Sequence, residues 1–509
     1  FKKYGADKEG ILKILEADSR PEVLYALSDI RRNLMDWMDF LGQEHVLQLG
    51  SDYGVITGLL AERCASVAVV DERDENLVVN QKMNEAHTNI SYMKAADFQK
   101  MEAVEKEGKY DLIVLRADRP DMDIKECFTR LSSYLSENGK LIFACENALG
   151  LNFLSGAVHD EDETAFTKGE LEEALKEAGL SKVEFYYPMP EYKRAVSVYS
   201  DRYLPGKGDI PHVTAVYDRQ RWACIHEDEI SDKLVQEKAF GLFSNAYLAV
   251  ASKGAESFKT VFAKYNSTRK EEFQIRTAIL EENGKRYVEK TPLTEKAAGH
   301  ISSMSEKYEK LSKVNPGVKV LAPVYSEDKK AVRFEFLKGR TLAEILGEQI
   351  RGKKAPVEAL KAAIYQIFGQ AVLKNEPFAP TDPFKEVFGD SEDVLSLQDT
   401  SYEVSNIDGL FENLMETEDG LYCMDYEWVF DFPLPSGFVR YRNLVYFYYK
   451  YEGLMEYENA TQFLKEFGMD EKLAETYASM EVAFQTWVHG DGTQGYLGNY
   501  KQRLVTLEE

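Results

Sequence analysis

The stretch HVLQLGSDYGVITGLLAERCASVAVVD, residues 45–71, constrains the fold of this chain more than any other. Its apolar pattern predicts a buried strand up to Gly50, a helix after Gly54 and a second strand that ends in Asp71. A strand, a glycine turn, a helix and an acidic strand end are the parts of a nucleotide-type binding site. The stretch therefore predicts an open α/β sheet with a ligand at the turn.

The residue types of the turn narrow the ligand. Glycine at positions 50 and 54 permits a sharp turn and a close approach of a ligand to the backbone, and Asp71 can accept from both hydroxyls of a ribose. The turn lacks the third glycine and the full spacing of a dinucleotide fingerprint. We therefore expect S-adenosylmethionine rather than NAD.

The alternation of strands and helices continues beyond the turn. VLQL, SVAVV, ISYM, YDLIVL and KLIFAC are strand-like and are separated by amphipathic stretches, which predicts a doubly wound, Rossmann-like sheet. KVEFYYPMP and SNAYLAVAS are two later strands that would close it as an antiparallel hairpin. We expect this domain over residues 41–255, with an insertion at about 206–238 and a helical cap over 1–40.

The pattern changes after residue 256. Short strands that read as antiparallel come first and helices follow, which predicts an α+β domain over 256–509. A chain of 509 residues is too long for one ordinary core.

Composition excludes several classes of function. The net charge of −25 argues against a broad nucleic-acid surface, because such binding depends on clustered Lys and Arg. The apolar runs fall short of the roughly 20 residues that span a bilayer, so we expect no transmembrane segment. Five scattered cysteines fit a reducing, cytoplasmic location. The negative net charge also disfavours binding to an anionic membrane, so an acceptor at a membrane would be presented by a partner.

Residues 40–160 resemble class I S-adenosylmethionine-dependent methyltransferases. In that resemblance Gly50, Asp52 and Gly54 form the cofactor turn, Asp71 holds the ribose and Asp97 faces the adenine. Many members carry an acid at the position of Gln48, near the methionine ammonium. A neutral Gln48 can accept a hydrogen bond there but supplies no charge.

CENALGLNFLSG, which contains Glu146 and Asn147, resembles methyltransferases of bacterial surface-polysaccharide clusters. The resemblance implies a glycan or glycolipid-linked sugar as acceptor. His159 or Glu146 would serve as the base for a sugar hydroxyl, although either residue also reads as an ordinary solvated loop residue. A phosphate oxygen as acceptor would need no base. The negative net charge disfavours a nucleic-acid methyltransferase. The segment after the fourth strand disfavours it too, because ADRPD stands there in place of an Asn/Asp-Pro-Pro-aromatic motif.

The second half resembles protein kinases and aminoglycoside phosphotransferases. The resemblance implies ATP and Mg²⁺ as ligands and assigns six residues. Lys290 would bind phosphates and pair with Glu306 or Glu309, Asp408 would be the catalytic base, and Asn413 and Asp425 would bind Mg²⁺.

Three departures leave the activity of this half open. Asn406 replaces the catalytic histidine, Glu427 stands at the glycine of the metal-binding motif, and KYNSTRKEEF contains no glycine where a glycine-rich loop is expected. Both halves together resemble bifunctional kinase and methyltransferase enzymes that terminate polysaccharide chains. The alternative is a methyltransferase fused to a non-catalytic kinase-like domain that binds a glycan or a glycosyltransferase.

Overall fold

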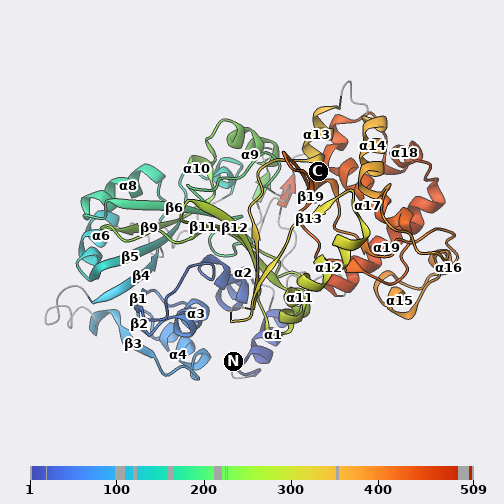
Figure 1. The fold of residues 1–509 in the computed structure, drawn as a ribbon. Helices are drawn as coiled ribbons and strands as arrows, with labels where there is room; N and C mark the ends of the chain where they lie inside the picture. The colour runs from blue at the N-terminus through green and yellow to red at the C-terminus, as the bar shows by residue number, and fades with distance from the viewer. Residues whose placement is uncertain are drawn as a thin grey trace. The chain divides into compact units, whose positions relative to one another are not determined.

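The computed structural model describes residues 3–18, 20–97, 109–117, 123–157, 164–210, 221–223, 225, 227–328, 330–350, 355–490 and 504–506. The chain forms two compact units, coloured mainly blue to green and yellow to red in Figure 1. The first unit comprises Phe1–Tyr265, Ala278–Gly284 and Gly495–Glu509, and the second comprises Asn266–Thr277 and Lys285–Gln494. The domain boundary predicted between 255 and 256 stays a prediction.

The first unit is built on a twisted sheet whose neighbouring strands are β3-β2-β1-β4-β5-β9-β6-β7-β10-β11. The first five of these are parallel, and β9 lies antiparallel between β5 and β6. The predicted antiparallel closure of the sheet is therefore confirmed. The strands are β1 His45–Leu49, β2 Ser66–Asp71, β3 Ile90–Lys94, β4 Tyr110–Arg116, β5 Leu135–Glu146, β6 Lys182–Met189, β7 Ser197–Ser200, β9 Ala246–Ser252, β10 Thr260–Tyr265 and β11 Ile275–Glu282, with β8 Arg221–Ala223 and β21 Leu504–Thr506 paired apart from the sheet.

The chain leaves β1 on one side toward β2 and β3 and returns on the other side as β4 and β5. The carboxyl end of β1 is therefore the topological switch point, where open α/β sheets bind ligands. Side chains of β1, β4 and β5 that are fully buried fill the core beneath it, among them Leu47, Ile113 and Phe143. The helices are α3 Val55–Arg63, α4 Asp74–Met83, α6 Ile124–Ser132, α7 Leu151–Leu154, α8 Lys168–Glu177, α9 Glu227–Gln236 and α10 Phe240–Phe243.

The N-terminal segment is helical, as its spacing predicts. It forms α1 Lys8–Ala17, α2 Pro21–Leu27 and the short 3₁₀ helix η1 Asp29–Leu34. Trp37, which follows η1, is buried and lies against Tyr186 of β6, with 4.3 Å between the ring centroids. Asn33 of η1 donates to the carbonyl of Ala195 at 2.9 Å. These contacts hold the end of the cap against the sheet.

The second unit has the predicted α+β order. β12 Lys285–Pro292 pairs antiparallel with β15 Ala331–Glu335, which pairs with β14 Val324–Ser326. A smaller sheet has the order β13-β19-β18-β16. Its strands and the remaining elements are β13 Lys319–Val320, β16 Arg340–Thr341, β18 Leu414–Thr417, β19 Gly420–Cys423, the pair β17 Ser405–Asn406 and β20 Val429–Phe430, α11 Ala298–Ser302, α12 Met304–Val314, α13 Leu342–Glu348, α14 Val357–Phe368, α15 Asp382–Phe388, α16 Glu392–Leu395, α17 Ser436–Tyr451, α18 Ala460–Lys465 and α19 Glu471–His489, with the 3₁₀ turns η2 Glu271–Phe273, η3 Glu295–Ala297, η4 Phe411–Asn413 and η5 Glu452–Leu454.

Aromatic side chains fill much of the core of the second unit. Phe438, Phe447 and Tyr448 of α17 are buried, and Phe388 of α15 lies against Phe484 of α19.

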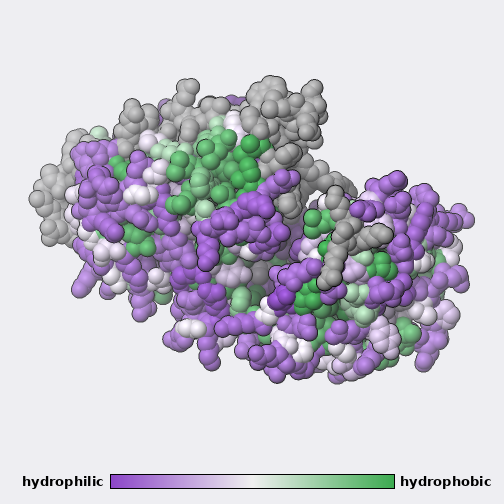
Figure 2. All heavy atoms as spheres, turned by 90° about the horizontal axis from the view of Figure 1, so that it is seen from above, coloured by the Kyte–Doolittle hydropathy of each residue, from purple (hydrophilic) through white to green (hydrophobic). Residues whose placement is uncertain are grey.

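The surface in Figure 2 is largely hydrophilic, with smaller apolar areas between. Leu149, Leu154 and Leu242 are among the large apolar side chains that remain exposed. No helix within the described ranges is both long and apolar enough to cross a membrane.

Candidate functional site

The turn between β1 and α3 adopts a backbone that ordinary residues avoid. Gly50, Asp52 and Gly54 have φ values of +78°, +46° and +105°. A Cβ at Gly54 would lie 2.5 Å from Nδ2 of Asn84, so both the conformation and the space require glycine there. The backbone N–H of Gly50 donates to the carbonyl of Val70 in β2 at 2.9 Å. The turn is therefore a fixed cradle above the switch point.

Gln48 supports this turn from within. Its side-chain Oε1 accepts from the hydroxyl of Thr57 at 2.9 Å, and its Nε2 lies 3.3 Å from the carbonyl of Gly50. The residue is buried and lies along the wall of the pocket below the turn. Both ends of the Gln48 amide therefore contact other groups of the chain, and this uncharged side chain supports the turn.

Asp71 lies at the end of β2, where a ribose-binding acid is predicted. Its Oδ2 accepts from the N–H and the hydroxyl of Ser51, both at 2.7 Å, and its Oδ1 accepts from the N–H of Arg73 at 2.9 Å. The amide of Asn76 lies 3.2 and 3.3 Å from the two oxygens. The Asn76 bonds are the longest and are the ones that a ribose hydroxyl could replace.

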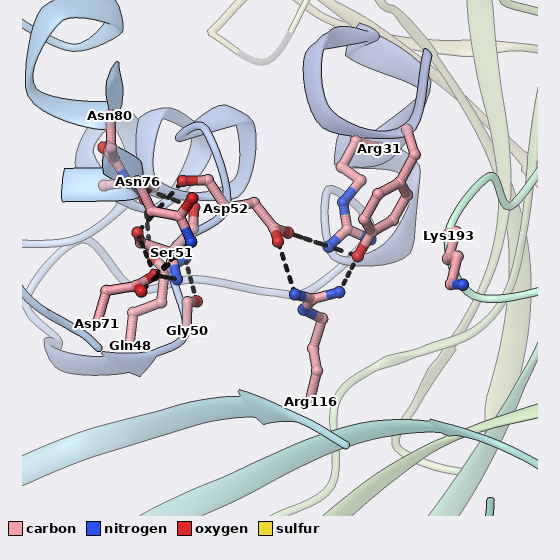
Figure 3. A network of polar contacts seen from close by, with 12 residues as sticks. Arg31, Gln48, Gly50, Ser51, Asp52, Asp71, Asn76, Asn80, Arg116 and Lys193 are labelled. Atoms are coloured by element: carbon pink, nitrogen blue, oxygen red, sulfur yellow. Dashed lines mark hydrogen bonds and ion pairs between the residues drawn. The ribbon is translucent and has the colours of Figure 1, made fainter. Parts of the chain in front are cut away.

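Asp52 is the centre of a charged cluster drawn in Figure 3. Arg31 of η1 approaches Oδ2 of Asp52 at 2.8 Å, and Arg116 at the end of β4 approaches Oδ1 at 2.6 Å. The hydroxyl of Tyr25 accepts from Arg116 and lies 3.4 Å from Asp52. Lys193 lies near the same ring, with Nζ 5.6 Å from its centroid. This cluster brings together the cap, the cofactor turn and the end of β4.

Neither Arg31 nor Tyr25 is predicted as a site residue from the sequence. The only local signal was a pair of arginines, Arg31 and Arg32, in a helical segment otherwise read as a cap. Arg31 is 3% exposed, whereas Arg32 pairs with Glu62 in a half-exposed contact. Helical spacing alone does not say which of two adjacent cations turns inward.

A pocket lies between the turn, the cap and the ends of the central strands, with about 370 Å³ of empty space including its open mouth. Its lining residues are Arg31, Leu34, Met35, Gln48, Leu49, Gly50, Asp52, Ile56, Val114, Leu115, Arg116, Ile142, Ala144 and Leu248. Apolar walls with a few charged groups at one end are typical of small-molecule sites. The residues present fit a ligand that has an apolar body and a charged end.

The remaining residues predicted for this site are more scattered. Asp97 follows β3 and is exposed, and His159 lies outside the described residues. Glu146 ends β5, and its carbonyl accepts from the N–H of Phe166 at 3.1 Å. Neighbouring Asn147 is buried and donates to the carbonyls of Leu242 and Ser244 at 2.8 and 2.7 Å. Asn147 thus ties the loop after β5 to the start of β9, which is a structural role.

In the second unit, the residues predicted to bind phosphates and metal do converge. Lys290 of β12 is buried, and its Nζ lies 2.7 Å from Oδ1 of Asp425. The amide of Asn413 donates to the carbonyl of Asp408 at 2.8 Å, and Asp408 accepts from the N–H of Trp428 at 2.9 Å. Burial and the carboxylates of Asp425 and Glu427 raise the pKa of Asp408 to about 7.

The predicted partner of Lys290 is wrong. Glu306 and Glu309 both lie on the exposed side of α12, and Glu306 pairs with Lys310 at 2.8 Å. Lys290 instead lies 2.5 Å from Oε1 of Glu427. The residue of α12 that faces inward is a lysine and not the predicted glutamate. This residue is Lys307, whose Nζ donates to the backbone carbonyl of Glu427. Burial lowers the pKa of Lys307 to about 8.

Glu427 forms an ion pair with a second cation, which the sequence did not predict. Arg269, from the loop NSTRKEEF, lies 2.6 Å from Oε2 of Glu427. Burial alone would raise the pKa of Glu427, but Lys290 and Arg269 outweigh it and hold the pKa well below its usual range. His300 lies 3.8 Å from the same carboxylate, and burial lowers its pKa. Within the described ranges, no group of three acidic, His or Cys side chains is arranged to hold a metal ion.

Comparisons with known proteins complete the description. No family model and no curated protein matches the chain. A putative methyltransferase from Bacillus halodurans is 15% identical over 44% of this chain and 99% of its own, with a TM-score of 0.27. An S-adenosylmethionine-dependent methyltransferase from Archaeoglobus fulgidus is 15% identical over 45% and 93%, with a TM-score of 0.30. WbdD, solved with a kinase inhibitor, is 13% identical over 90% and 88%, with a TM-score of 0.25.

These similarities are too low to assign a role to any residue. Within the longer sheet of the first unit, the strands β3-β2-β1-β4-β5-β9-β6 are neighbours in this order, and β9 runs antiparallel to the strands on either side of it. Together with the glycine turn at the switch point, this order gives the first unit a doubly wound, Rossmann-like fold.

Proposed function

We propose that the chain is an S-adenosylmethionine-dependent methyltransferase that acts on a sugar or phospho-sugar of a surface polysaccharide. The observation that carries this proposal is the left-handed turn at Gly50 and Gly54 above the switch point, with the acid Asp71 on the next strand. A turn and an acid in this relation suit a ligand that combines a ribose with a charged tail.

When bound, S-adenosylmethionine would supply a methyl group to an acceptor oxygen, with S-adenosylhomocysteine as the leaving group. The chain's own task is then to hold both reactants and to exclude water. Gly50 and Gly54 let the backbone approach the cofactor, Asp71 would hold its ribose, and exposed Asp97 would face its adenine. Gln48 keeps the turn in place through Thr57.

The acceptor would enter at the carboxyl ends of β4 and β5. Arg116 and Glu146 stand there, and the segment with His159 follows. Glu146 or His159 is proposed as the base that takes the proton of a sugar hydroxyl. An acceptor that is already anionic needs no base, and Arg116 would then be the group that attracts it. Glycosyltransferases that build the same polysaccharide are the proposed partners, and the cytoplasm is the proposed location.

Calorimetry with S-adenosylhomocysteine tests the cofactor. Wild-type protein is expected to bind, and Asp71→Asn is expected to weaken binding by about tenfold, since one charge-assisted hydrogen bond contributes roughly 1.5–3 kcal/mol. Glu72→Gln is the matched control, because Glu72 is the next residue and is exposed. Absence of binding by the wild-type protein at millimolar ligand would contradict the proposal.

The acceptor class needs a separate experiment. Transfer of a labelled methyl group would be measured with neutral oligosaccharides and with the same oligosaccharides carrying a terminal phosphate. Removal of the base in Glu146→Gln is expected to slow transfer to a hydroxyl and to spare transfer to a phosphate oxygen. Methylation of proteins or nucleic acids in preference to both sugars would reject the glycan acceptor.

A second candidate function concerns the second unit, which we propose to be kinase-like and to bind a nucleotide with Mg²⁺. Lys290 and Asp425 lie in direct contact, and Asp408 and Asn413 are joined by a hydrogen bond. A lysine for phosphates, two oxygen ligands for a metal and an acid for the hydroxyl are the groups that phosphoryl transfer uses. Their convergence supports catalysis with Asp408 as base.

The pairing of Lys290 and Arg269 with Glu427 supports the alternative, a non-catalytic domain that binds a glycan or a glycosyltransferase. Calorimetry with Mg-ATP separates the two. Catalysis requires binding that Lys290→Ala and Asp425→Ala abolish, while a surface variant, Glu418→Gln, retains it. If the wild-type protein has no affinity for Mg-ATP, or if Lys290→Ala and Asp425→Ala leave that affinity unchanged, the domain is non-catalytic.

A further inference from the structure

Lys290 lies between two carboxylates that differ in their exposure to solvent. Its Nζ is 2.7 Å from Oδ1 of Asp425 and 2.5 Å from Oε1 of Glu427. The side chain of Asp425 is 34% exposed, whereas that of Glu427 is 4% exposed and that of Lys290 is 6% exposed. A cation from solution therefore reaches the carboxylate of Asp425, while that of Glu427 stays enclosed.

Glu427 is held in place by groups other than Lys290. Arg269 lies 2.6 Å from the second carboxylate oxygen, Oε2, and Lys307 donates to the backbone carbonyl of Glu427. The guanidinium of Arg269 also lies 5.5 Å from the ring centroid of Trp428. The negative charge of Glu427 thus has a fixed position beside Lys290.

Asp425 is the carboxylate of this pair that the proposed Mg²⁺ site uses. A carboxylate with an open side suits Mg²⁺, which is usually bound by one or two carboxylates together with waters and phosphates. Lys290 already places a positive charge at this carboxylate. A metal ion beside the ammonium would be repelled by it, because the two charges have the same sign. Lys290 must therefore move away from Asp425 before a metal ion can bind there.

Glu427 lets Lys290 leave Asp425 without the loss of its last charged partner. A buried ammonium that has neither water nor an anion is strongly disfavoured. With Glu427 in place, the ammonium keeps one carboxylate, and the N–H group freed from Asp425 can turn to a phosphate. Helix α12 supplies no acid for this role, since Glu306 and Glu309 lie on its exposed side.

We propose that Glu427 is a positioning residue that holds Lys290 while Asp425 binds the metal ion, so that the two carboxylates share one lysine in turn. This inference rests on the nucleotide and Mg²⁺ binding proposed for the second unit. It gives Glu427 a role in metal binding although Glu427 touches neither the metal nor the nucleotide. It also accounts for an acid two residues after Asp425, where the kinase motif has glycine.

Binding of Mn²⁺ to the full chain, measured from the electron paramagnetic resonance signal of the free ion, tests this role. Mn²⁺ takes the same oxygen ligands as Mg²⁺, and the binding that Asp425→Asn removes defines the site. Glu427→Gln is expected to weaken this binding by about tenfold, since Lys290 then has no second carboxylate. Lys290→Met is expected to strengthen it, because no ammonium then competes with the metal ion.

The double variant Glu427→Gln with Lys290→Met separates positioning from damage to the fold. It lacks the same carboxylate as the single variant, but it has no ammonium left to hold, so it should bind Mn²⁺ at least as tightly as the wild type. Glu289→Gln is the matched control, because Glu289 is largely buried, pairs with Arg333 at 3.1 Å and points to the other face of β12. It should leave the Mn²⁺ affinity unchanged.

Unchanged Mn²⁺ affinity in either single variant would overturn the exchange. A double variant as weak as Glu427→Gln would overturn it too, because Glu427 would then act as a metal ligand or only as a support of the fold. If Asp425→Asn removes no Mn²⁺ binding, Asp425 is not a metal residue and the inference fails. Mg-ATP calorimetry tests the proposed function separately: if Mn²⁺ binds as expected but Mg-ATP does not, nucleotide binding fails and the role of Glu427 stands.

Discussion

Replacement of Glu427 by glutamine is the sharpest stability test that the second unit offers. The carboxylate is 4% exposed and lies 2.5 Å from Lys290 and 2.6 Å from Arg269. Glutamine keeps the shape and one acceptor but removes the charge that both cations face. Lys290 retains Asp425 at 2.7 Å, whereas Arg269 loses the carboxylate of its ion pair.

The magnitude follows from the burial of the pair. Removal of one partner of a buried ion pair costs about 3–5 kcal/mol, because the remaining charge is left without compensation. Since one of the two cations keeps a partner, we expect Glu427→Gln to lose about 3 kcal/mol of unfolding free energy. Glu427→Gln combined with Arg269→Met should lose less than the sum of the single losses, since neither buried charge of this pair is then left alone.

The assay is urea unfolding of the full chain, followed by tryptophan fluorescence. Trp428 follows Glu427 directly, and the guanidinium of Arg269 lies 5.5 Å from its ring centroid, so this one of the chain's four tryptophans reports on the cluster. Exposed Glu418→Gln is the control. A loss below about 1 kcal/mol for Glu427→Gln, or strictly additive losses, would refute the reasoning that this buried carboxylate balances two cations.

The pH dependence gives the same test a second readout. Lys290 and Arg269 hold the pKa of Glu427 well below its ordinary value of 4.5, against the effect of burial. An acid whose folded pKa is lowered contributes stability above its unfolded pKa and loses that contribution as the pH falls through the folded pKa. The difference between wild type and Glu427→Gln should therefore be constant near neutrality and shrink only below about pH 4.5.

Three further predictions concern single contacts. Gly54→Ala should cost about 1–3 kcal/mol of unfolding free energy, through backbone strain and the clash with Asn84. Gly179→Ala should cost less, because φ is +77° there but no atom lies within 4 Å of the added Cβ. Thermal unfolding compares the two variants, and equal losses of stability would contradict the clash. Burial and the neighbouring carboxylates raise the pKa of Asp408 to about 7. As the pH rises from its usual pKa of 3.8 to 7, the wild type should therefore lose about 1.4 kcal/mol of unfolding free energy per pH unit relative to Asp408→Asn. Urea titrations at about pH 5 and pH 7 measure this loss, and a constant difference between the two proteins would contradict it. Asn147→Ala should cost about 2 kcal/mol, since the buried carbonyl of Ser244 loses its side-chain donor and the carbonyl of Leu242 keeps only the hydroxyl of Tyr247, and a loss under about 0.5 kcal/mol would contradict that structural role.

Local patterns predicted the first unit well because its chemistry is local. Gly50, Gly54 and Asp71 belong to one strand, turn, helix and strand unit, and the period of the apolar residues sets the register of each element. The strand order follows from the alternation of strands with helices and from the two late strands that read as a hairpin. In the second unit the same reasoning found Lys290 and Asp425, which are 135 positions apart but belong to an ordered series of motifs.

Local patterns did not predict the partners of buried charges. Arg31 lies 21 positions from Asp52, and Arg269 lies 158 from Glu427. No periodicity relates such residues, because the contact arises only when the elements pack. The predicted pairing of Lys290 with Glu306 or Glu309 failed for the same reason, since the rotation of α12 about its axis decides whether a glutamate or Lys307 faces inward.

The two ion pairs that the sequence did not predict, Arg31 with Asp52 and Arg269 with Glu427, have one feature in common. In each unit an acid stands on a loop at a strand end where the motif tolerates a small or neutral residue, Asp52 in the glycine turn and Glu427 at the motif glycine. Glu427 is buried and Asp52 is half-buried, and a carboxylate that has lost water in this way is stabilised by a cation that reaches it from elsewhere. Such an acid therefore predicts an inward-facing Lys or Arg in a segment that otherwise reads as surface. The cap with Arg31 and the glycine-free loop with Arg269 are those segments, so both belong to the sites and not to the solvent-facing shell.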